Sequence, residues 1–251
     1  MQWLVRGESQ VPRGHQWLTA TEAARASTMR YTKRRNEYLL RRYAGKCAVA
    51  AVVGHPSDAA SLGRIAVLNR VTGAPYVEVD GRTLDMDISL TDRAGWAVCL
   101  VGPDLRAVGV DLEIVEPRSD GFVRDFLTPA EREIVGGASG SDGHDAAANL
   151  IWSAKESALK VLRTGLRADT RTVEVVVAEP SSVSRRTSQW QRLSVVSAAG
   201  TFPGWWRRDG VFVLTVVAAA GLADPPQALP DSADLSQAEP VHSWVDRPLV
   251  E

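Results

Sequence analysis

Two acidic residues lie two positions apart in the otherwise apolar stretch Val108-Gly109-Val110-Asp111-Leu112-Glu113-Ile114. The alternation predicts a strand on which Asp111 and Glu113 share one face and the aliphatic side chains share the other. Two carboxylates in this arrangement can hold a hard cation such as Mg²⁺, which prefers oxygen ligands. A strand with one face in water shows the same alternation, so this segment alone leaves both interpretations open. Gly109 would leave room for a ligand or another backbone to come close.

A second charged cluster follows about forty residues later, in Trp152-Ser153-Ala154-Lys155-Glu156-Ser157-Ala158-Leu159-Lys160. Only four of the 29 basic residues are lysines, and two of the four fall here. On a helix Lys155 falls inside an apolar arc, so its ammonium must reach solvent or find a partner. Glu156 and Lys160 are spaced i,i+4 in the favourable acid-first order. An exposed ion pair on a helix has the same spacing, so a structural interpretation stays open here too.

The elements that must position these residues can be read from the periodicity and the turn residues. Residues 19–50 predict a helix that Thr19 or Thr21 caps. The apolar run 97–101 and the segment 108–114 predict two strands joined through a turn at 102–104, and thus a hairpin. The second half predicts a helix from about Pro129, a Gly/Ser-rich break at 136–145, a helix at 149–164, and strands at 172–178, 192–198 and 211–219.

Helix followed by antiparallel strands thus occurs twice, which predicts an α+β fold of two similar halves, residues 1–107 and 108–220. We identify no convincing residue-by-residue identity between the halves. The remaining segment, 221–251, holds six acids against one base and five of the 13 prolines. We expect this acidic tail to be extended and to have no catalytic role.

Composition excludes several classes of protein. A chain of 251 residues with 45% hydrophobic and 24% charged residues is globular. No apolar run is long enough to cross a membrane and the N-terminus is too polar for a secretory signal, so we expect a soluble cytoplasmic protein with no membrane partner. Cys47 and Cys99 lie in apolar stretches without a CxxC pattern, which supports neither a disulfide framework nor a zinc site.

The net charge of −1 conceals a basic segment, because residues 30–46 carry seven basic residues against one acid. A nucleic-acid-binding module is one interpretation of that segment. It is disfavoured because the segment is short, the sequence pI is about 6.5, and no motif of interleaved aromatic and basic residues appears.

Taken together, the two charged motifs resemble the paired signature of the 4′-phosphopantetheinyl transferases, (I/V)G(I/V)DxE followed by WxxKE(S/A)xxK. Each motif alone is weak, whereas both in this order and at this spacing are specific. The resemblance spans about residues 20–220 and also includes Gly73-Ala74-Pro75, Ile88-Ser89-Leu90-Thr91-Asp92 and Phe126-Leu127-Thr128-Pro129-Ala130-Glu131. The length is that of the larger, monomeric Sfp-type class. The resemblance implies a pseudo-twofold fold with the active site in the cleft between the halves.

The activity that the resemblance implies is transfer of the phosphopantetheine arm of coenzyme A to a serine of an apo acyl or peptidyl carrier protein, releasing adenosine 3′,5′-bisphosphate. By this resemblance Asp111, Glu113 and Glu156 would hold Mg²⁺ at the pyrophosphate. Glu156 would also be the general base. Lys160 would hold the phosphate, and Lys155 would orient Glu156 or contact the diphosphate. Glu131 is the second candidate for metal binding or base catalysis.

Coenzyme A carries a 3′-phosphate, for which arginine forks are suited. The cofactor-binding residues that we predict, besides Lys155 and Lys160, are Arg34, Arg41, Lys46, Gly73, Pro75, Thr91 and Asp92. Any one of the basic side chains among them has the alternative of simply solvating a helix face. Two positions depart from the family: Asp92 replaces a histidine that commonly contacts a coenzyme A phosphate, and Ala74 replaces a lysine. We therefore expect the basic helix to carry more of the coenzyme A binding.

The departure at Asp92 also leaves a second interpretation, a catalytically impaired family member that binds coenzyme A or a carrier protein without turnover. The carrier itself, whether of fatty-acid, polyketide or peptide synthesis, is not specified by the residues. We expect it to dock near Phe122, Phe126 and Leu127.

Overall fold

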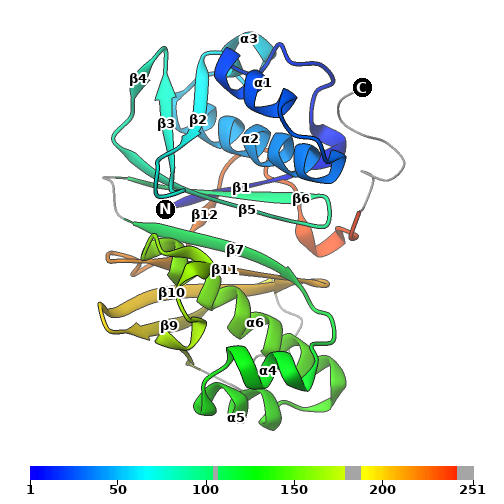
Figure 1. The fold of residues 1–251 in the computed structure, drawn as a ribbon, viewed down its shortest axis with the longest axis vertical. Helices are drawn as coiled ribbons and strands as arrows, with labels where there is room; N and C mark the ends of the chain where they lie inside the picture. Colours follow the sequence, from blue (N-terminus) through cyan, green and yellow to red (C-terminus); the bar gives the residue numbers. More distant parts are fainter. Residues whose placement is uncertain (104–106, 179–187, 242–251) are drawn as a thin grey trace. The chain divides into compact units, whose positions relative to one another are not determined.

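The computed structural model describes residues 1–103, 107–178 and 188–241. The chain divides into two compact units: unit 1 is Met1–Leu105, Gln227–Asp234 and Pro240–Glu251, and unit 2 is Arg106–Pro226 and Leu235–Glu239. Each unit combines helices with antiparallel strands (Figure 1), which confirms the predicted α+β class. None of the helices in the described residues is long and apolar enough to cross a membrane.

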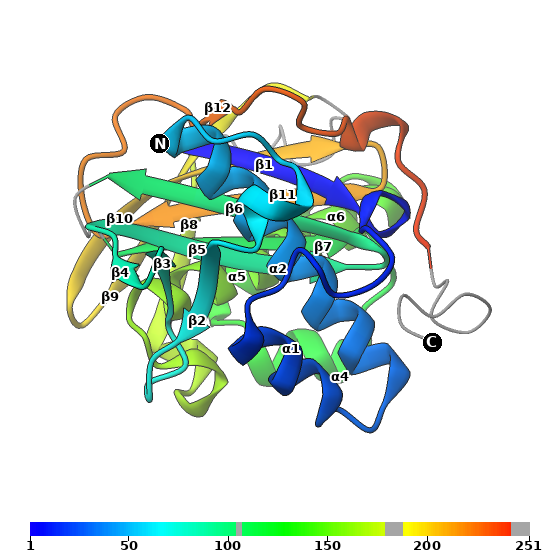
Figure 2. The ribbon, with the colours of Figure 1, turned by 90° about the horizontal axis from the view of Figure 1, so that it is seen from above.

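Unit 1 places one long helix against a four-stranded sheet. The strand order is β12 (Gln227–Ala228), β1 (Gln2–Gly7), β6 (Trp96–Pro103) and β5 (Met86–Arg93). Helix α2 (Thr32–Val53) packs on β6, β1 and β5, and α1 (Ala20–Ser27) lies beside α2 (Figure 2). A separate three-stranded sheet contains β2 (Ile65–Asn69), β3 (Pro75–Val79) and β4 (Arg82–Thr83), and two short helices complete the unit, η1 (Glu8–Gln10) and α3 (Ala59–Leu62).

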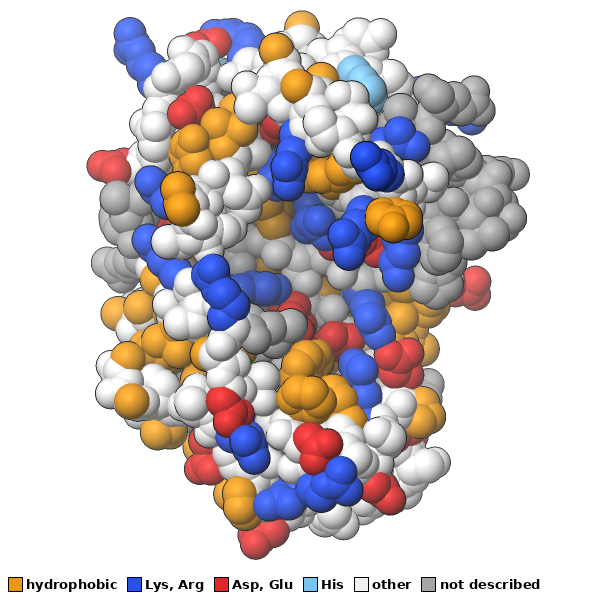
Figure 3. All heavy atoms as spheres, viewed as in Figure 1, with side chains coloured by type: hydrophobic (Ala, Val, Ile, Leu, Met, Phe, Trp, Pro, Cys, Tyr) orange, Lys and Arg blue, Asp and Glu red, His pale blue; other side chains and the backbone are white. Residues whose placement is uncertain are grey.

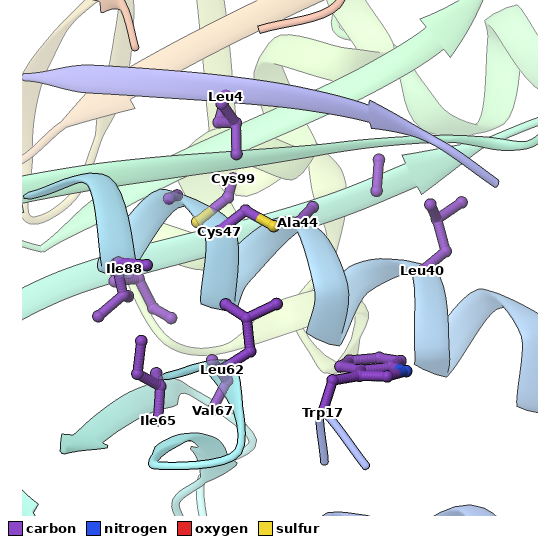
Figure 4. Packing of buried hydrophobic residues seen from close by; sticks show 14 of the residues in the cluster. Leu4, Trp17, Leu40, Ala44, Cys47, Leu62, Ile65, Val67, Ile88 and Cys99 are labelled. Atoms are coloured by element: carbon purple, nitrogen blue, oxygen red, sulfur yellow. The ribbon is translucent and has the colours of Figure 1, made fainter. Parts of the chain in front are cut away.

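The core of unit 1 lies between α2 and these strands. Figure 4 shows Cys47 of α2 and Cys99 of β6 with their sulfur atoms among aliphatic side chains such as Leu4 and Ile88. Both cysteines are free and buried. Burial raises the pKa of both thiols, so neither is an activated nucleophile.

Unit 2 has the same plan with a five-stranded antiparallel sheet. The strand order is β7 (Val108–Ile114), β11 (Phe212–Ala218), β10 (Gly200–Asp209), β9 (Gln191–Ser197) and β8 (Val173–Val177). Helix α6 (Gly140–Val161) packs mainly on β7 and β11, and α5 (Pro129–Gly137) packs on α6. Four short elements complete the unit: α4 (Asp120–Phe126), η2 (Gly165–Arg167), η3 (Thr170–Thr172) and η5 (Leu235–Gln237).

Both units contain the same buried ion pair, which we call the Glu–Lys clamp. In unit 1 Thr19 and Glu22 form a capping box at the start of α1, and the Glu22 carboxylate pairs with Lys46 Nζ at 2.5 Å. A carboxylate oxygen of Glu22 also accepts from the Val67 amide of β2 at 3.0 Å. Each clamp thus ties a short helix, a long helix and a strand together.

The clamp of unit 2 repeats this arrangement with Thr128, Glu131, Lys155 and the Val175 amide, at 2.8 Å for the ion pair and 2.7 Å for the amide. Glutamate and lysine are 24 residues apart in both units. The halves therefore do share a residue pattern, contrary to the sequence-based expectation. The sequence does not reveal this pattern, because its members are single residues separated by stretches that differ between the halves.

Three predicted elements differ from the structure. Residues 19–50 form two helices, α1 and α2, with Thr19 as the cap of the first. The Gly/Ser-rich stretch is mostly helical, because α6 begins at Gly140. Strands β6 and β7 do not form a hairpin, since β6 pairs with β1 and β5 while β7 pairs with β11. Residue 104 of the predicted turn lies outside the described residues.

The predicted extended tail is partly incorporated into the fold. Of its described part, residues 221–241, Gln227 and Ala228 form the short strand β12 beside β1. Leu229 is buried in unit 1, and Leu235 is buried at the start of η5 in unit 2. Composition alone did not predict this, because only a few apolar residues along the acidic segment hold it to the fold.

Candidate active site

The two acidic residues of β7 are buried. Asp111 is 3% exposed and Glu113 is 7% exposed, so they do not form the solvent-facing side of a surface strand. The face of β7 that carries the two carboxylates packs against α6, which makes an ionised carboxylate costly unless it has partners. The charges here therefore have to be balanced by specific neighbours.

The backbone of helix α6 packs directly against the backbone of β7 because Gly109 has no side chain. A Cβ atom added at this position would lie 1.9 Å from the carbonyl oxygen of Ser157. The Ser157 hydroxyl also contacts the Thr215 hydroxyl of β11 at 2.8 Å. Of the two expected uses of Gly109, room for a ligand or for another backbone, the structure shows the second. The close packing also places Glu156 of α6 next to Asp111.

Asp111, Glu156 and Lys160 form a compact charged group. The Glu156 carboxyl lies close enough to Asp111 for the two acids to interact electrostatically. Lys160 Nζ donates to Asp111 Oδ1 at 2.9 Å and to the Val110 carbonyl oxygen at 2.7 Å. Burial, followed by the charge of Asp111, raises the pKa of Glu156 to about 7, although Lys160 acts in the opposite direction. The two acids thus lie close enough to disfavour simultaneous ionisation.

Glu113 belongs to the same site but has different partners. Its Oε1 accepts from Trp152 Nε1 at 3.1 Å, and its Oε2 accepts from Arg118 Nη2 at 3.1 Å. Its charge also contributes to the raised pKa of Glu156. Arg118 was not predicted from the sequence, where the only signal is an arginine shortly after the acidic strand.

The donor chemistry of Asp111, Glu113 and Glu156 fits a hard divalent cation. All three supply carboxylate oxygens, and their mutual repulsion is the kind that a cation relieves. Within the described residues, however, no group of three or more His, Cys, Asp or Glu is assembled as a ready metal site. The Glu113 carboxylate accepts one hydrogen bond at each oxygen, from Trp152 and from Arg118.

This carboxylate site lies inside a segment that is similar to a known family. Residues 107–204 match the 4′-phosphopantetheinyl transferase superfamily. The match runs from the start of β7 into β10, so it includes every residue of the site just described. It supports transferase chemistry in this segment. No curated protein matches the chain.

Within the segment that matches the transferase superfamily, Lys155 does not reach the site. Its Nζ is fully buried and bonds to Glu131 at 2.8 Å, to the Thr170 carbonyl at 3.0 Å and to the Val173 carbonyl at 2.5 Å. Glu131 is thus the partner that the Lys155 ammonium was expected to need in its apolar surroundings. This placement corrects the prediction that Lys155 contacts the diphosphate, and it also removes Glu131 as a candidate metal ligand or base.

Among the predicted coenzyme A residues of α2, Lys46 is likewise enclosed. It is fully buried in the clamp of unit 1, so its assignment to a phosphate is corrected as well. Arg41 is about one-third exposed and forms an ion pair with Asp92 of β5. Arg34 is exposed and lies over the Tyr31 ring. Figure 3 shows Lys and Arg side chains gathered over α2.

The remaining predicted positions of unit 1 occupy two strands and a turn. Gly73 has a positive φ of 92° in the β2–β3 turn, and a Cβ there would meet nothing within 4 Å. Pro75 begins β3, and Thr91 is buried on β5 next to Asp92.

The residues expected near a docked carrier fall into two kinds. Phe126 is 39% exposed and packs with Phe122 and Trp152 at ring-centroid distances of 5.0 and 5.4 Å. Leu127 is buried, so it is not available for a partner.

Proposed function

We propose that the protein transfers the 4′-phosphopantetheine arm of coenzyme A to a serine hydroxyl of an apo acyl or peptidyl carrier protein, in a Mg²⁺-dependent reaction. The observation that carries this proposal is the bond of Lys160 to Asp111, with Glu156 beside them, within the segment that matches the superfamily. The match supports a transferase. The metal, the carrier and the reaction details belong to the proposal.

The residue roles follow from the charges that the reaction must manage. The serine oxygen attacks the β-phosphorus of coenzyme A, the bond from that phosphorus to the bridging oxygen breaks, and adenosine 3′,5′-bisphosphate leaves. Glu156 takes the serine proton. Lys160, whose Nζ donates to Asp111, is proposed to bind the phosphate and to stabilise the negative charge that shifts to the leaving group. Asp111, Glu113 and Glu156 would hold Mg²⁺, which supplies Lewis-acid stabilisation of the pyrophosphate.

Coenzyme A contacts are proposed for unit 1. Arg34 is exposed and Arg41 is about one-third exposed on α2, so both guanidinium groups can reach a phosphate. The resemblance adds Gly73, Pro75, Thr91 and Asp92 to the proposed contacts. Lys46 and Lys155 are left out, because both are buried in clamps.

The proposal is tested by mass spectrometry of carrier proteins. The full chain is incubated with coenzyme A, Mg²⁺ and apo acyl or peptidyl carriers, and each carrier is weighed. A gain equal to one phosphopantetheine group supports the proposal. Absence of the gain across carriers of fatty-acid, polyketide and peptide synthesis would sink it. Coenzyme A binding by calorimetry without such a gain would instead favour the impaired family member.

A further inference from the structure

Arg118 lies between β7 and α4, and its guanidinium joins three parts of unit 2. Its Nη2 donates to Glu113 Oε2 at 3.1 Å and its Nε donates to Asn149 Oδ1 at 2.7 Å. The guanidinium carbon lies 4.9 Å from the centre of the Phe122 ring. Only 18% of the side chain is exposed. Arg118 therefore donates from separate nitrogens of its planar guanidinium group to a residue of strand β7 and to a residue of helix α6.

Asn149 gives this guanidinium group a fixed anchor. The residue is fully buried in α6, and its Nδ2 donates to the carbonyl oxygens of Glu116 at 2.7 Å and Asp145 at 2.8 Å. These two bonds set the direction in which the amide oxygen points. Asn149 therefore fixes the Nε group of the guanidinium whose Nη2 donates to Glu113.

Glu113 is held from two directions. Trp152 Nε1 donates to one oxygen and Arg118 Nη2 to the other. A carboxylate oxygen has more than one acceptor site, so these bonds leave capacity for a metal ion. The Trp152 ring is itself packed against Phe122 at a centroid distance of 5.0 Å. Both donors to Glu113 are thus fixed by packing or by hydrogen bonds.

We infer that Arg118 is a positioning residue that orients the Glu113 carboxylate and thereby raises the affinity of the site for a divalent cation. The inference rests on the proposed function, in which Glu113 is a metal ligand. Groups that hydrogen-bond to metal ligands typically contribute about 10- to 100-fold to metal affinity. Lysine cannot replace arginine in this role, because a single ammonium does not reproduce the planar fork.

A purely electrostatic role makes the opposite prediction. A cation beside a metal site repels the metal, so a charge effect alone would let Arg118→Met bind metal more tightly and leave Arg118→Lys unchanged. Positioning instead predicts that both substitutions weaken binding. The two variants therefore separate orientation from charge.

The experiment measures Mn²⁺ binding to the full chain through the loss of the free-ion electron paramagnetic resonance signal, with Mn²⁺ as a hard, oxygen-preferring probe. We expect Arg118→Lys and Arg118→Met to raise the dissociation constant about tenfold or more. The matched control is Arg124→Met on α4, since Arg124 is 66% exposed and pairs with Asp125. We expect the control to change the constant by less than about twofold. Circular dichroism checks folding, and Arg118→Lys carries the test if Arg118→Met unfolds.

A double variant shows whether the effect passes through Glu113. We expect Glu113→Gln with Arg118→Lys to bind Mn²⁺ no more weakly than Glu113→Gln alone. Wild-type affinity in Arg118→Lys, or an additive loss in the double variant, overturns the inference while leaving carrier modification intact. A wild-type chain that binds no Mn²⁺ overturns the metal assignment of the proposed function together with the inference.

Discussion

At the scale of single residues, the ion pair between Arg41 and Asp92 changes how a phosphate could be received. Arg41 projects from α2 and Asp92 from β5, at the position where the family resemblance leads one to expect a histidine. Burial, followed by the charge of Asp92, raises the pKa of neighbouring Glu37. Asp92 therefore both pairs with an arginine that was predicted to bind phosphate and adds negative charge to that predicted phosphate site.

Asp92→Asn should improve coenzyme A binding, because it releases Arg41 and removes a charge that repels phosphate. A gain of about 1 kcal/mol corresponds to a Michaelis constant about fivefold lower. The control is Asp80→Asn, which removes an aspartate from the exposed ion pair with Arg64 in the same unit. Steady-state kinetics with coenzyme A as the varied substrate measures both. A raised or unchanged constant for Asp92→Asn would show that Asp92 does not weaken phosphate binding.

At the scale of elements, the close packing of β7 against α6 is what brings acids from two elements together. Gly109 lies against the Ser157 carbonyl, and Glu156 immediately precedes that serine. The identity of a single residue thus controls the separation of Asp111 from Glu156.

Gly109→Ala should force the strand and helix apart, since its Cβ would lie 1.9 Å from a backbone oxygen. We expect a loss of about 1–3 kcal/mol in unfolding free energy, together with weaker metal binding. Gly136→Ala in α5 is the control, because a Cβ there meets nothing within 4 Å. Thermal unfolding and Mn²⁺ titration measure the two effects. Wild-type values for Gly109→Ala would contradict the close approach.

The Glu–Lys clamps are predicted to stabilise each unit without taking part in chemistry. Lys46→Met leaves the Glu22 carboxylate buried without its ammonium, which typically costs about 3–5 kcal/mol. Lys33→Met removes an exposed i,i+4 pair and should cost less than about 0.5 kcal/mol. Urea unfolding monitored by circular dichroism measures both. Equal midpoints for the two variants would mean that the clamp is not a stabilising element.

At the scale of the whole molecule, the two units share a framework but differ in their chemical residues. Lys46 of one clamp is followed by Cys47, whereas Lys155 of the other is followed by Glu156. Unit 2 carries the acidic site and the superfamily match, and α2 of unit 1 carries the basic surface. The formal charge of −1 therefore averages a basic helix, a buried acidic site and an acidic C-terminal segment.

Local patterns were sufficient to predict the α+β class, whereas the grouping of Asp111 with Glu156 and Lys160 was predicted from the resemblance to a family. Strand alternation, helical spacing and the glycine at 109 are short-range signals. Other features depended on contacts distant in sequence. The partner of Lys155 is 24 residues away, and Arg118 became a candidate only once Glu113 and Asn149 were seen to converge on it.

Strand pairing was the least predictable part of the fold. The strand β10 was missed because Gly200, Pro203 and Gly204 interrupt its apolar pattern. The hairpin between β6 and β7 was expected because the two strands are adjacent in sequence. Their actual partners are β1 and β5 for β6 and β11 for β7, and these pairings depend on tertiary packing between segments distant in sequence.

The most direct test of the central claim compares wild type with Asp111→Asn in the carrier assay. Asparagine keeps the size of the side chain but removes the charge that is proposed to hold the metal. With coenzyme A, Mg²⁺ and an apo carrier that wild type modifies, we predict full conversion by wild type and a rate about 1000-fold or more lower for the variant. Circular dichroism confirms that the variant is folded. A folded Asp111→Asn that converts the carrier at the wild-type rate would contradict the account.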